Sequence, residues 1–158
     1  MRLQTWCLAL LVCSWSTAAY GQVERDDHSI VFELGAAGDW ERGEAIHSGG
    51  TFAFEVTPIE HWLELEFGVT ALAADHGTEV PFDVIFKKPW QPSSKFEFMV
   101  GVGPEVAKGS FGVEGVLDFM FWPSKNVGWY VEPGYEVTWH DGAQHRGLGI
   151  AFGLLLGK

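Results

Sequence analysis

Residues 127–139 constrain this chain more than any other segment, because apolar and polar positions alternate along their whole length. One set of alternate positions is apolar or aromatic throughout: Val127, Trp129, Val131, Pro133, Tyr135, Val137 and Trp139. The positions between them are mostly small or polar, so the period of two predicts a strand with one apolar face. Ten residues separate Trp129 from Trp139, which is about 33 Å of strand. Tilted by about 40°, this strand covers roughly 25 Å, the height of the apolar band on a membrane-spanning strand.

Seven other segments alternate in the same way, and the eight predicted strands are residues 29–39, 51–57, 63–72, 79–87, 95–103, 111–122, 127–139 and 147–156. Loop and turn residues separate them in the ranges 41–50, 58–62, 75–78, 88–94, 104–110, 123–126 and 141–144. Short connections favour pairing between strands that follow one another in sequence. The pattern therefore predicts an all-β fold, an eight-stranded antiparallel up-and-down barrel. Pro133 cannot donate to a ladder, so we expect a bulge at Pro133 and Gly134.

The number of large apolar side chains indicates which face of each strand points outward. Eight strands enclose an interior just wide enough for side chains to fill, and about five large apolar groups from each strand would overfill it. Those groups have room if they point into lipid, which makes the barrel a transmembrane one. The crowded interior then takes small residues: Gly68, Gly101, Gly112, Gly128, Gly149 and Gly153. The alternative is a soluble periplasmic, lipocalin-like barrel with its apolar face inward and a small apolar ligand.

The tryptophans provide a second argument for a membrane barrel. With eight strands, both chain ends lie on one side, and four tryptophans fall near that side: Trp62, Trp90, Trp122 and Trp129. Trp40 and Trp139 fall near the other side. Two aromatic belts are expected at two membrane interfaces.

The first residues have the pattern of a secretory signal peptide. A positive charge at Arg2 precedes an apolar core over residues 6–15, and small residues follow it. We expect a signal peptide over residues 1–21, a short lead over 22–28 and the barrel over 29–158. Both cysteines, Cys7 and Cys13, lie within the signal, so the mature chain has no disulfide or thiolate chemistry.

The chain is strongly acidic, with a formal net charge of −11. This charge argues against nucleic acid as a partner, because nucleic acid requires basic patches. It also argues against attachment to anionic lipid through basic residues.

Residues 31–156 resemble small bacterial outer-membrane β-barrel proteins, and the run from Phe119 to Tyr135 resembles an uncharacterised branch of them. The resemblance implies a location in the outer membrane, contact with outer-membrane lipid, assembly by the barrel-assembly machinery, and a monomer. Proteins of this kind usually end in an aromatic residue that the assembly machinery recognises. This chain ends in Gly157 and Lys158, so recognition is expected to rest on Phe152 and the nearby leucines.

The polar faces of the strands carry many carboxylates that a membrane barrel would enclose. The predicted lumen carboxylates are Glu33, Glu55, Glu64, Glu66, Asp83, Glu97, Glu114, Asp118, Glu132 and Glu136. Lys87 is the main interior cation, so these groups cannot all stay ionised without water, protons or bound cations. A cation-preferring lumen is one interpretation. A filled interior of hydrogen-bonded polar groups is favoured, because eight strands seldom leave an open channel.

No catalytic or metal site is expected. His47, His76, His140 and His145 fall in connections, but no spacing among them is typical of a metal site. Barrel enzymes that resemble lipid A deacylases carry a His-x-Ser pair near the end of the chain, and His47 and Ser48 lack that spacing. The sequence therefore predicts a non-enzymatic integral outer-membrane barrel without a cofactor, with a structural, surface-interaction or limited permeation role. An outer-membrane lipid-modifying enzyme is a less favoured alternative.

Overall fold

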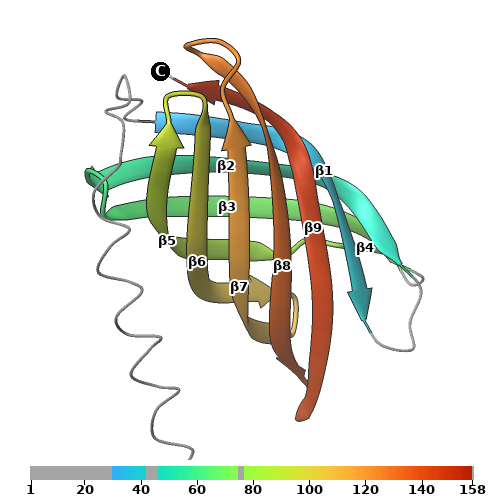
Figure 1. The fold of residues 1–158 in the computed structure, drawn as a ribbon. Helices are drawn as coiled ribbons and strands as arrows, with labels where there is room; N and C mark the ends of the chain where they lie inside the picture. Colours follow the sequence, from blue (N-terminus) through green and yellow to red (C-terminus); the bar gives the residue numbers. More distant parts are fainter. Residues whose placement is uncertain (1–29, 42–45, 75–76, 158) are drawn as a thin grey trace, which may run out of the picture.

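The computed structural model describes residues 30–41, 46–74 and 77–157 as a closed, all-antiparallel barrel (Figure 1). The predicted signal peptide over 1–21 and the lead over 22–28 lie outside these described residues. Its strands are β1 (Ile30–Glu41), β2 (His47–Ile59), β3 (Leu63–Ala74), β4 (Gly77–Glu79), β5 (Phe82–Ser93), β6 (Phe96–Ala107), β7 (Ser110–Phe121), β8 (Val127–His140) and β9 (Ala143–Gly157). Among the described residues, no helix is long and apolar enough to cross a membrane.

Strands that follow one another in sequence pair, except β4 with β5, and β1 pairs with β9 to close the barrel. The short β4 and the longer β5 both pair with β3. Only Val80 and Pro81 separate these two strands, so together they occupy the fourth of eight positions around the barrel. This arrangement confirms the predicted eight-stranded antiparallel architecture.

Alternation along each strand separates an apolar outer surface from a polar interior. In β1, Phe32 is 40% exposed whereas the next residue, Glu33, is 1% exposed. Aromatic rings on neighbouring strands stack across the outer surface, such as Phe98 on Phe119 with ring centroids 5.6 Å apart. A wide apolar outer surface with polar groups inside is the pattern of a barrel in lipid.

Glycines provide interior space where strands and side chains crowd together. Gly68, Gly101, Gly112 and Gly128 are buried, and Gly149 and Gly153 are half-buried. A Cβ atom at Gly101 would lie 2.6 Å from Ile85, 2.8 Å from Val116 and 2.9 Å from the Lys87 side chain. A side chain at position 101 would therefore collide with the interior groups that surround Lys87.

The predicted connection at 88–94 is wrong, because β5 continues as a strand to Ser93. The last pair between β5 and β3 is Lys87 with Glu64, and beyond it β5 pairs only with β6. Pro89 and Pro92 have no N–H group to donate. They are tolerated here because this stretch of β5 has no partner strand on the side of β3. The Lys88 ammonium donates to the backbone oxygen of His61, which ties this extension to the turn between β2 and β3.

The predicted turn at 104–110 is also wrong over most of its length. β6 continues to Ala107, and Lys108 and Gly109 alone turn the chain into β7. Pro104 lies exposed on the outer surface, opposite Val113. Two further strands start earlier than predicted, β2 at His47 and β9 at Ala143. In each case a neighbouring strand supplies ladder partners where composition alone indicated a loop.

The expected break at Pro133 occurs on one side of β8 without a bulge. On the β9 side, pairing is continuous, with Pro133 opposite Ile150. On the β7 side, pairing stops between Val116–Gly134 and Phe119–Val131 and resumes in the same register. Because proline lacks the N–H, bridging is lost locally, but no extra residue is inserted.

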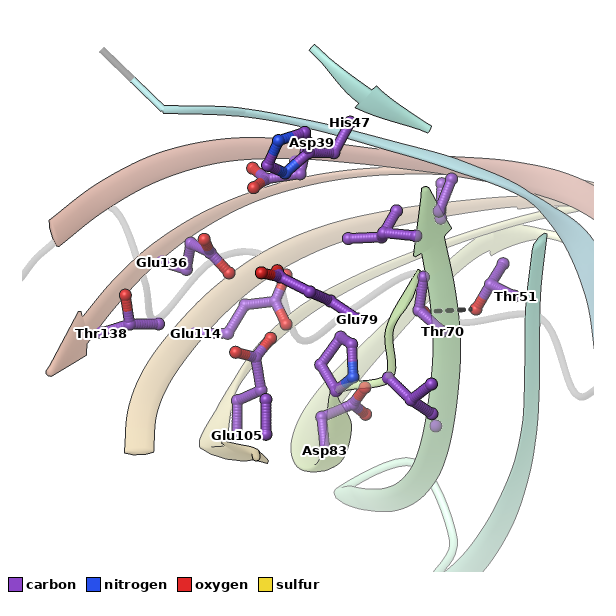
Figure 2. A pocket seen from close by; sticks show the side chains of 18 of the residues that line it. Asp39, His47, Thr51, Thr70, Glu79, Asp83, Glu105, Glu114, Glu136 and Thr138 are labelled. Carbon is purple, nitrogen blue, oxygen red and sulfur yellow. Dashed lines mark hydrogen bonds between the residues drawn. The ribbon is translucent and has the colours of Figure 1, made fainter. Parts of the chain in front are cut away.

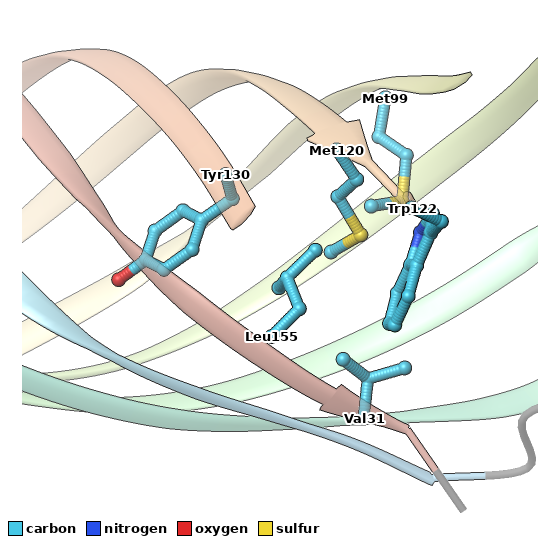
Figure 3. Packing of buried hydrophobic residues seen from close by; sticks show 6 residues of the cluster. All are labelled: Val31, Met99, Met120, Trp122, Tyr130 and Leu155. Carbon is cyan, nitrogen blue, oxygen red and sulfur yellow. The ribbon is translucent and has the colours of Figure 1, made fainter. Parts of the chain in front are cut away.

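Six buried apolar residues fill the barrel near the end where β1 begins and β9 ends, which we call the terminal rim (Figure 3). This apolar plug consists of Val31, Met99, Met120, Trp122, Tyr130 and Leu155. Trp122 was predicted to belong to an aromatic belt, but it is 5% exposed and packs inside. Because side chains alternate along a strand and Phe121 points outward, the next residue, Trp122, points inward. Its backbone N–H donates to the Lys95 carbonyl.

Candidate functional site

A cavity of about 680 Å³ occupies the interior toward the far rim, the end of the barrel opposite the terminal rim (Figure 2). Nine carboxylates line it: Asp39, Glu41, Glu66, Glu79, Asp83, Glu105, Glu114, Glu132 and Glu136. Among the described lining residues, Lys108 is the one lysine and there is no arginine. The lining reaches exposed residues at the rim, including Glu79, Lys108 and His140. The cavity is therefore strongly acidic and extends to the barrel surface at the far rim.

Side chains that alternate between the inner and outer faces of the strands shape this cavity, together with glycines on its wall. On β8, Glu132, Glu136 and Thr138 share the inward parity, and their side chains line the cavity. Figure 2 shows Glu105, Glu114 and Glu136 directed into the same space from β6, β7 and β8. On the opposite wall, the Thr70 hydroxyl donates to the Thr51 hydroxyl at 2.9 Å. The polar wall therefore comes from several strands and depends on their relative register.

A buried ion cluster around Lys87 lies at the inner end of the cavity. The Lys87 ammonium is 2.9 Å from Glu55, 2.9 Å from Asp118 and 2.6 Å from Glu132, and it also contacts Glu66. The five residues come from five strands, β2, β3, β5, β7 and β8. Glu66 and Glu132 also line the cavity, so the cavity and the cluster are continuous.

A fifth carboxylate, Glu33, joins this cluster. Glu33, Glu55, Glu66 and Asp118 each place one oxygen within 4.8 Å of the others, and all four residues are buried. We call Lys87 and its five carboxylates, including Glu132, the Lys87 cluster. Its five carboxylates exceed the single ammonium in number, so full ionisation would leave a large uncompensated charge in a buried space.

The apolar plug closes the interior on the other side of the Lys87 cluster. None of its six residues lines the cavity. Met99, Met120 and Leu155 are completely buried, at 0% exposure. In the described part of the chain, the cavity thus reaches the far rim and ends at an ion cluster with an apolar plug behind it.

The structure places the ten predicted lumen carboxylates in two groups. Buried are Glu33, Glu55, Glu64, Glu66, Glu97 and Asp118; half-buried are Asp83, Glu114, Glu132 and Glu136. The Lys87 cluster brings together Glu33, Glu55, Glu66, Asp118 and Glu132. Glu64 and Glu97 belong to neither the cavity lining nor this cluster.

Sequence reasoning missed four carboxylates of the cavity, namely Asp39, Glu41, Glu79 and Glu105. Glu105 was assigned to the predicted turn at residues 104–110. The alternation of Val102, Pro104 and Val106 with Gly103 and Glu105 contained the signal, since it continues the parity of β6.

Three of the four connection histidines lie at the far rim and line the cavity: His47, His140 and His145. His145 Nδ1 lies 3.1 Å from a Glu41 carboxylate oxygen. His76 lies outside the described residues. His47 and Ser48 are adjacent on β2, so their side chains point to opposite faces of the strand and do not form a catalytic pair.

Five of the six predicted belt tryptophans lie on or near the outer surface. Trp62 and Trp129 are exposed toward the terminal rim, and Trp90 is half-buried there against Phe98. Trp40 and Trp139 are exposed toward the far rim. Trp122 is the exception, as a member of the apolar plug.

A scan against protein-family models and a search of the curated proteins both find no match. Solved structures provide the comparison. Neisserial surface protein A is similar with a TM-score of 0.66 and 12% identity, over 82% of this chain and 97% of that chain. A de novo designed transmembrane β-barrel is similar with a TM-score of 0.64 and 12% identity, over 85% of this chain and 100% of that chain. The N-terminal β-barrel domain of Pseudomonas aeruginosa OprF has a TM-score of 0.53 and 10% identity, over 80% and 97% of the two chains. At these identities the likeness concerns the fold, and the fold of this chain is that of a small eight-stranded transmembrane β-barrel.

Proposed function

We propose that this chain is a non-enzymatic outer-membrane barrel that binds a cationic ligand in its acidic cavity at the cell surface. In this proposal the signal peptide over 1–21 directs export, the barrel-assembly machinery inserts the chain, and a monomer works in outer-membrane lipid. The terminal rim faces the periplasm and the far rim faces outward. The proposed role is one of surface interaction rather than permeation.

The observation that carries the proposal is the composition of the cavity. Its volume of about 680 Å³ lies within the range of about 300–1,000 Å³ typical of small-molecule sites. Nine carboxylates and one lysine lie on its described lining, and a bound cation would favour the ionised form of those carboxylates. Ionised walls of low dielectric focus a negative potential and concentrate cations at the mouth.

The inner end of the cavity supports binding rather than passage. A permeating ion would have to cross both the Lys87 cluster and the apolar plug. Met99, Met120 and Leu155 are fully buried in that plug, and close-packed apolar side chains leave no path for a hydrated ion. A blind acidic cavity is suited to capture of a ligand from the outer side.

An enzymatic role has no comparable support. A hydrolase of the Ser-His type requires a nucleophile within hydrogen-bond reach of its base. Ser110 lines the cavity together with His140, but no hydrogen bond joins them among the described side chains. The cavity chemistry is dominated by carboxylates, which suits the binding of positive charge.

Spermidine, a small trication, is a suitable probe of this cavity. The protein is purified from the membrane fraction in a zwitterionic detergent, and spermidine binding is measured by isothermal titration calorimetry. We expect saturable binding that weakens as salt rises, because added ions screen the carboxylates. The double variant Glu105→Gln/Glu136→Gln should weaken binding by about tenfold, since it removes two neighbouring carboxylates from the cavity wall.

Glu60→Gln is the matched control, because Glu60 is an exposed carboxylate in the turn between β2 and β3, at the terminal rim. It should leave spermidine affinity unchanged. Equal affinity of the double variant and the wild type would contradict the proposal, as would absence of saturable binding. Recovery of the protein in the soluble periplasm would contradict the membrane location.

A further inference from the structure

We propose that the barrel interior holds a divalent cation, of the kind that prefers oxygen ligands, between Glu33, Glu55, Glu66 and Asp118. This site lies at the inner end of the acidic cavity and differs from the rim carboxylates that bind a cationic ligand in the function proposed above. The metal site and the cationic-ligand site can therefore be refuted separately.

The geometry of the four carboxylates suits one metal ion. Each contributes an oxygen within 4.8 Å of the oxygens of the other three, and the four side chains converge from β1, β2, β3 and β7. Ca²⁺ binds oxygens at about 2.3–2.6 Å, so ligands on opposite sides of it lie about 4.6–5.2 Å apart. Mg²⁺ binds at about 2.0–2.1 Å, which requires a tighter group, with opposite ligands about 4.1 Å apart. A limit of 4.8 Å accommodates opposite ligands of either ion, and Ca²⁺ is the one that tolerates irregular carboxylate geometry.

Unpartnered oxygens provide an independent observation. Glu33 Oε1, Glu55 Oε2 and Asp118 Oδ1 are all buried without a hydrogen-bond partner. The residues themselves are 1%, 1% and 0% exposed. A buried carboxylate oxygen without a partner is costly, so a missing ligand, proton or ion is expected beside it.

Lys87 cannot satisfy this cluster alone. Its ammonium has three N–H donors, but four carboxylates contact it, those of Glu55, Glu66, Asp118 and Glu132. Glu55 and Asp118 each contact Lys87 through one oxygen and keep the other oxygen unpartnered. These two carboxylates can therefore bridge Lys87 and the metal, with one oxygen on the ammonium and the other on the metal. Glu33 binds the metal alone.

The charge of the cluster and its access support the same site. Five carboxylates and one ammonium sum to −4 when ionised, and a divalent cation reduces this excess to −2. Glu66 belongs to the four-carboxylate group and also lines the cavity. A cation that enters at the far rim thus passes along an acidic wall as far as Glu66, the member of the group that lines the cavity.

Calcium itself is the probe. The protein purified in detergent is stripped with a chelator, then titrated with CaCl₂ by calorimetry, and retained metal is counted by inductively coupled plasma mass spectrometry. We expect one Ca²⁺ per barrel. Glu33→Gln should weaken Ca²⁺ binding by tenfold or more, because Glu33 is the group that Lys87 does not contact. Glu60→Gln is the matched control and should bind as the wild type does.

Folding and selectivity controls keep the result decisive. Heat-dependent gel mobility confirms that each variant is folded, and if Glu33→Gln fails to fold, Asp118→Asn takes its place. Spermidine affinity should survive Glu33→Gln, which separates this site from the rim. The proposal is overturned if the stripped wild type binds no stoichiometric Ca²⁺, if Glu33→Gln binds Ca²⁺ as tightly as the wild type, or if only Glu105→Gln/Glu136→Gln removes Ca²⁺. The first of these results would mean that shared protons satisfy the carboxylates.

Discussion

Lys87 is the residue on which the charge balance of the interior depends. Its ammonium is fully buried and contacts carboxylates from four other strands. Replacing a buried ion network with packed apolar groups can be neutral, but removing one partner leaves the other charges without compensation. Lys87 therefore matters to stability mainly because its removal would leave buried carboxylates without a counter-charge.

Lys87→Met should destabilise the folded barrel by about 3–5 kcal/mol, because methionine keeps the stem and removes the ammonium that contacts four of the buried carboxylates. The measurement is reversible unfolding in urea with the protein in detergent micelles or lipid vesicles. Lys95→Met is the matched control, since Lys95 is exposed in the turn between β5 and β6. Equal urea midpoints for the two variants would show that the carboxylates of the cluster do not need the Lys87 charge to balance them.

The strands show which features sequence alone could predict. Period-two alternation located all eight barrel strands, since lipid outside and polar groups inside impose it on each of them. Strand ends were predicted less well. Pro89 and Pro104 lie in ranges predicted as connections, yet β5 and β6 continue through them. Where a strand ends depends on the ladders that its neighbours offer, and that information lies in distant parts of the chain.

Depth in the membrane determines how each outward position tolerates charge. Leu117 lies on the outer surface of β7 near the middle of the barrel, opposite Val100. Leu117→Arg should cost about 2–4 kcal/mol of folding free energy in lipid vesicles, because arginine at the bilayer midplane is poorly solvated.

Val127→Arg is the comparison, since Val127 is equally exposed but lies at the start of β8, on the terminal rim. There the cost should fall to about 0–1 kcal/mol. Folding yields and urea midpoints in vesicles measure both variants. If Leu117→Arg and Val127→Arg behave alike, the assumed membrane position of the barrel is incorrect.

At the scale of the whole molecule, the alternation along each strand predicted which carboxylates point inward, but not which of them lie close together. Sequence could assign Glu33, Glu55 and Asp118 to the inner face of their strands. It could not show that they meet at one height around Lys87, because that depends on the stagger between strands. For Trp122, alternation after Phe121 already indicates an inward side chain, but its partners in the apolar plug depend on the same stagger between strands.

The blind interior leads to an electrical prediction. The purified barrel in planar bilayers should show no steady ionic conductance, because the apolar plug blocks the path behind the Lys87 cluster. The double variant Met120→Ala/Trp122→Ala should raise conductance by removing two large plug residues while leaving the cavity wall intact. Discrete, long-lived open steps in the wild type would instead establish a pore.

The pairing of β1 with β9 has a consequence for the order of events in assembly. Eleven consecutive pairs join the two strands from Val31–Gly157 to Glu41–Gly147, so the first strand acquires its second neighbour from the last. Until β9 arrives, β1 and β8 each present an open edge that invites pairing with other chains. Contacts between residues so distant in sequence form slowly. The newly made chain must therefore be kept apart from its own copies until its final strand is in place.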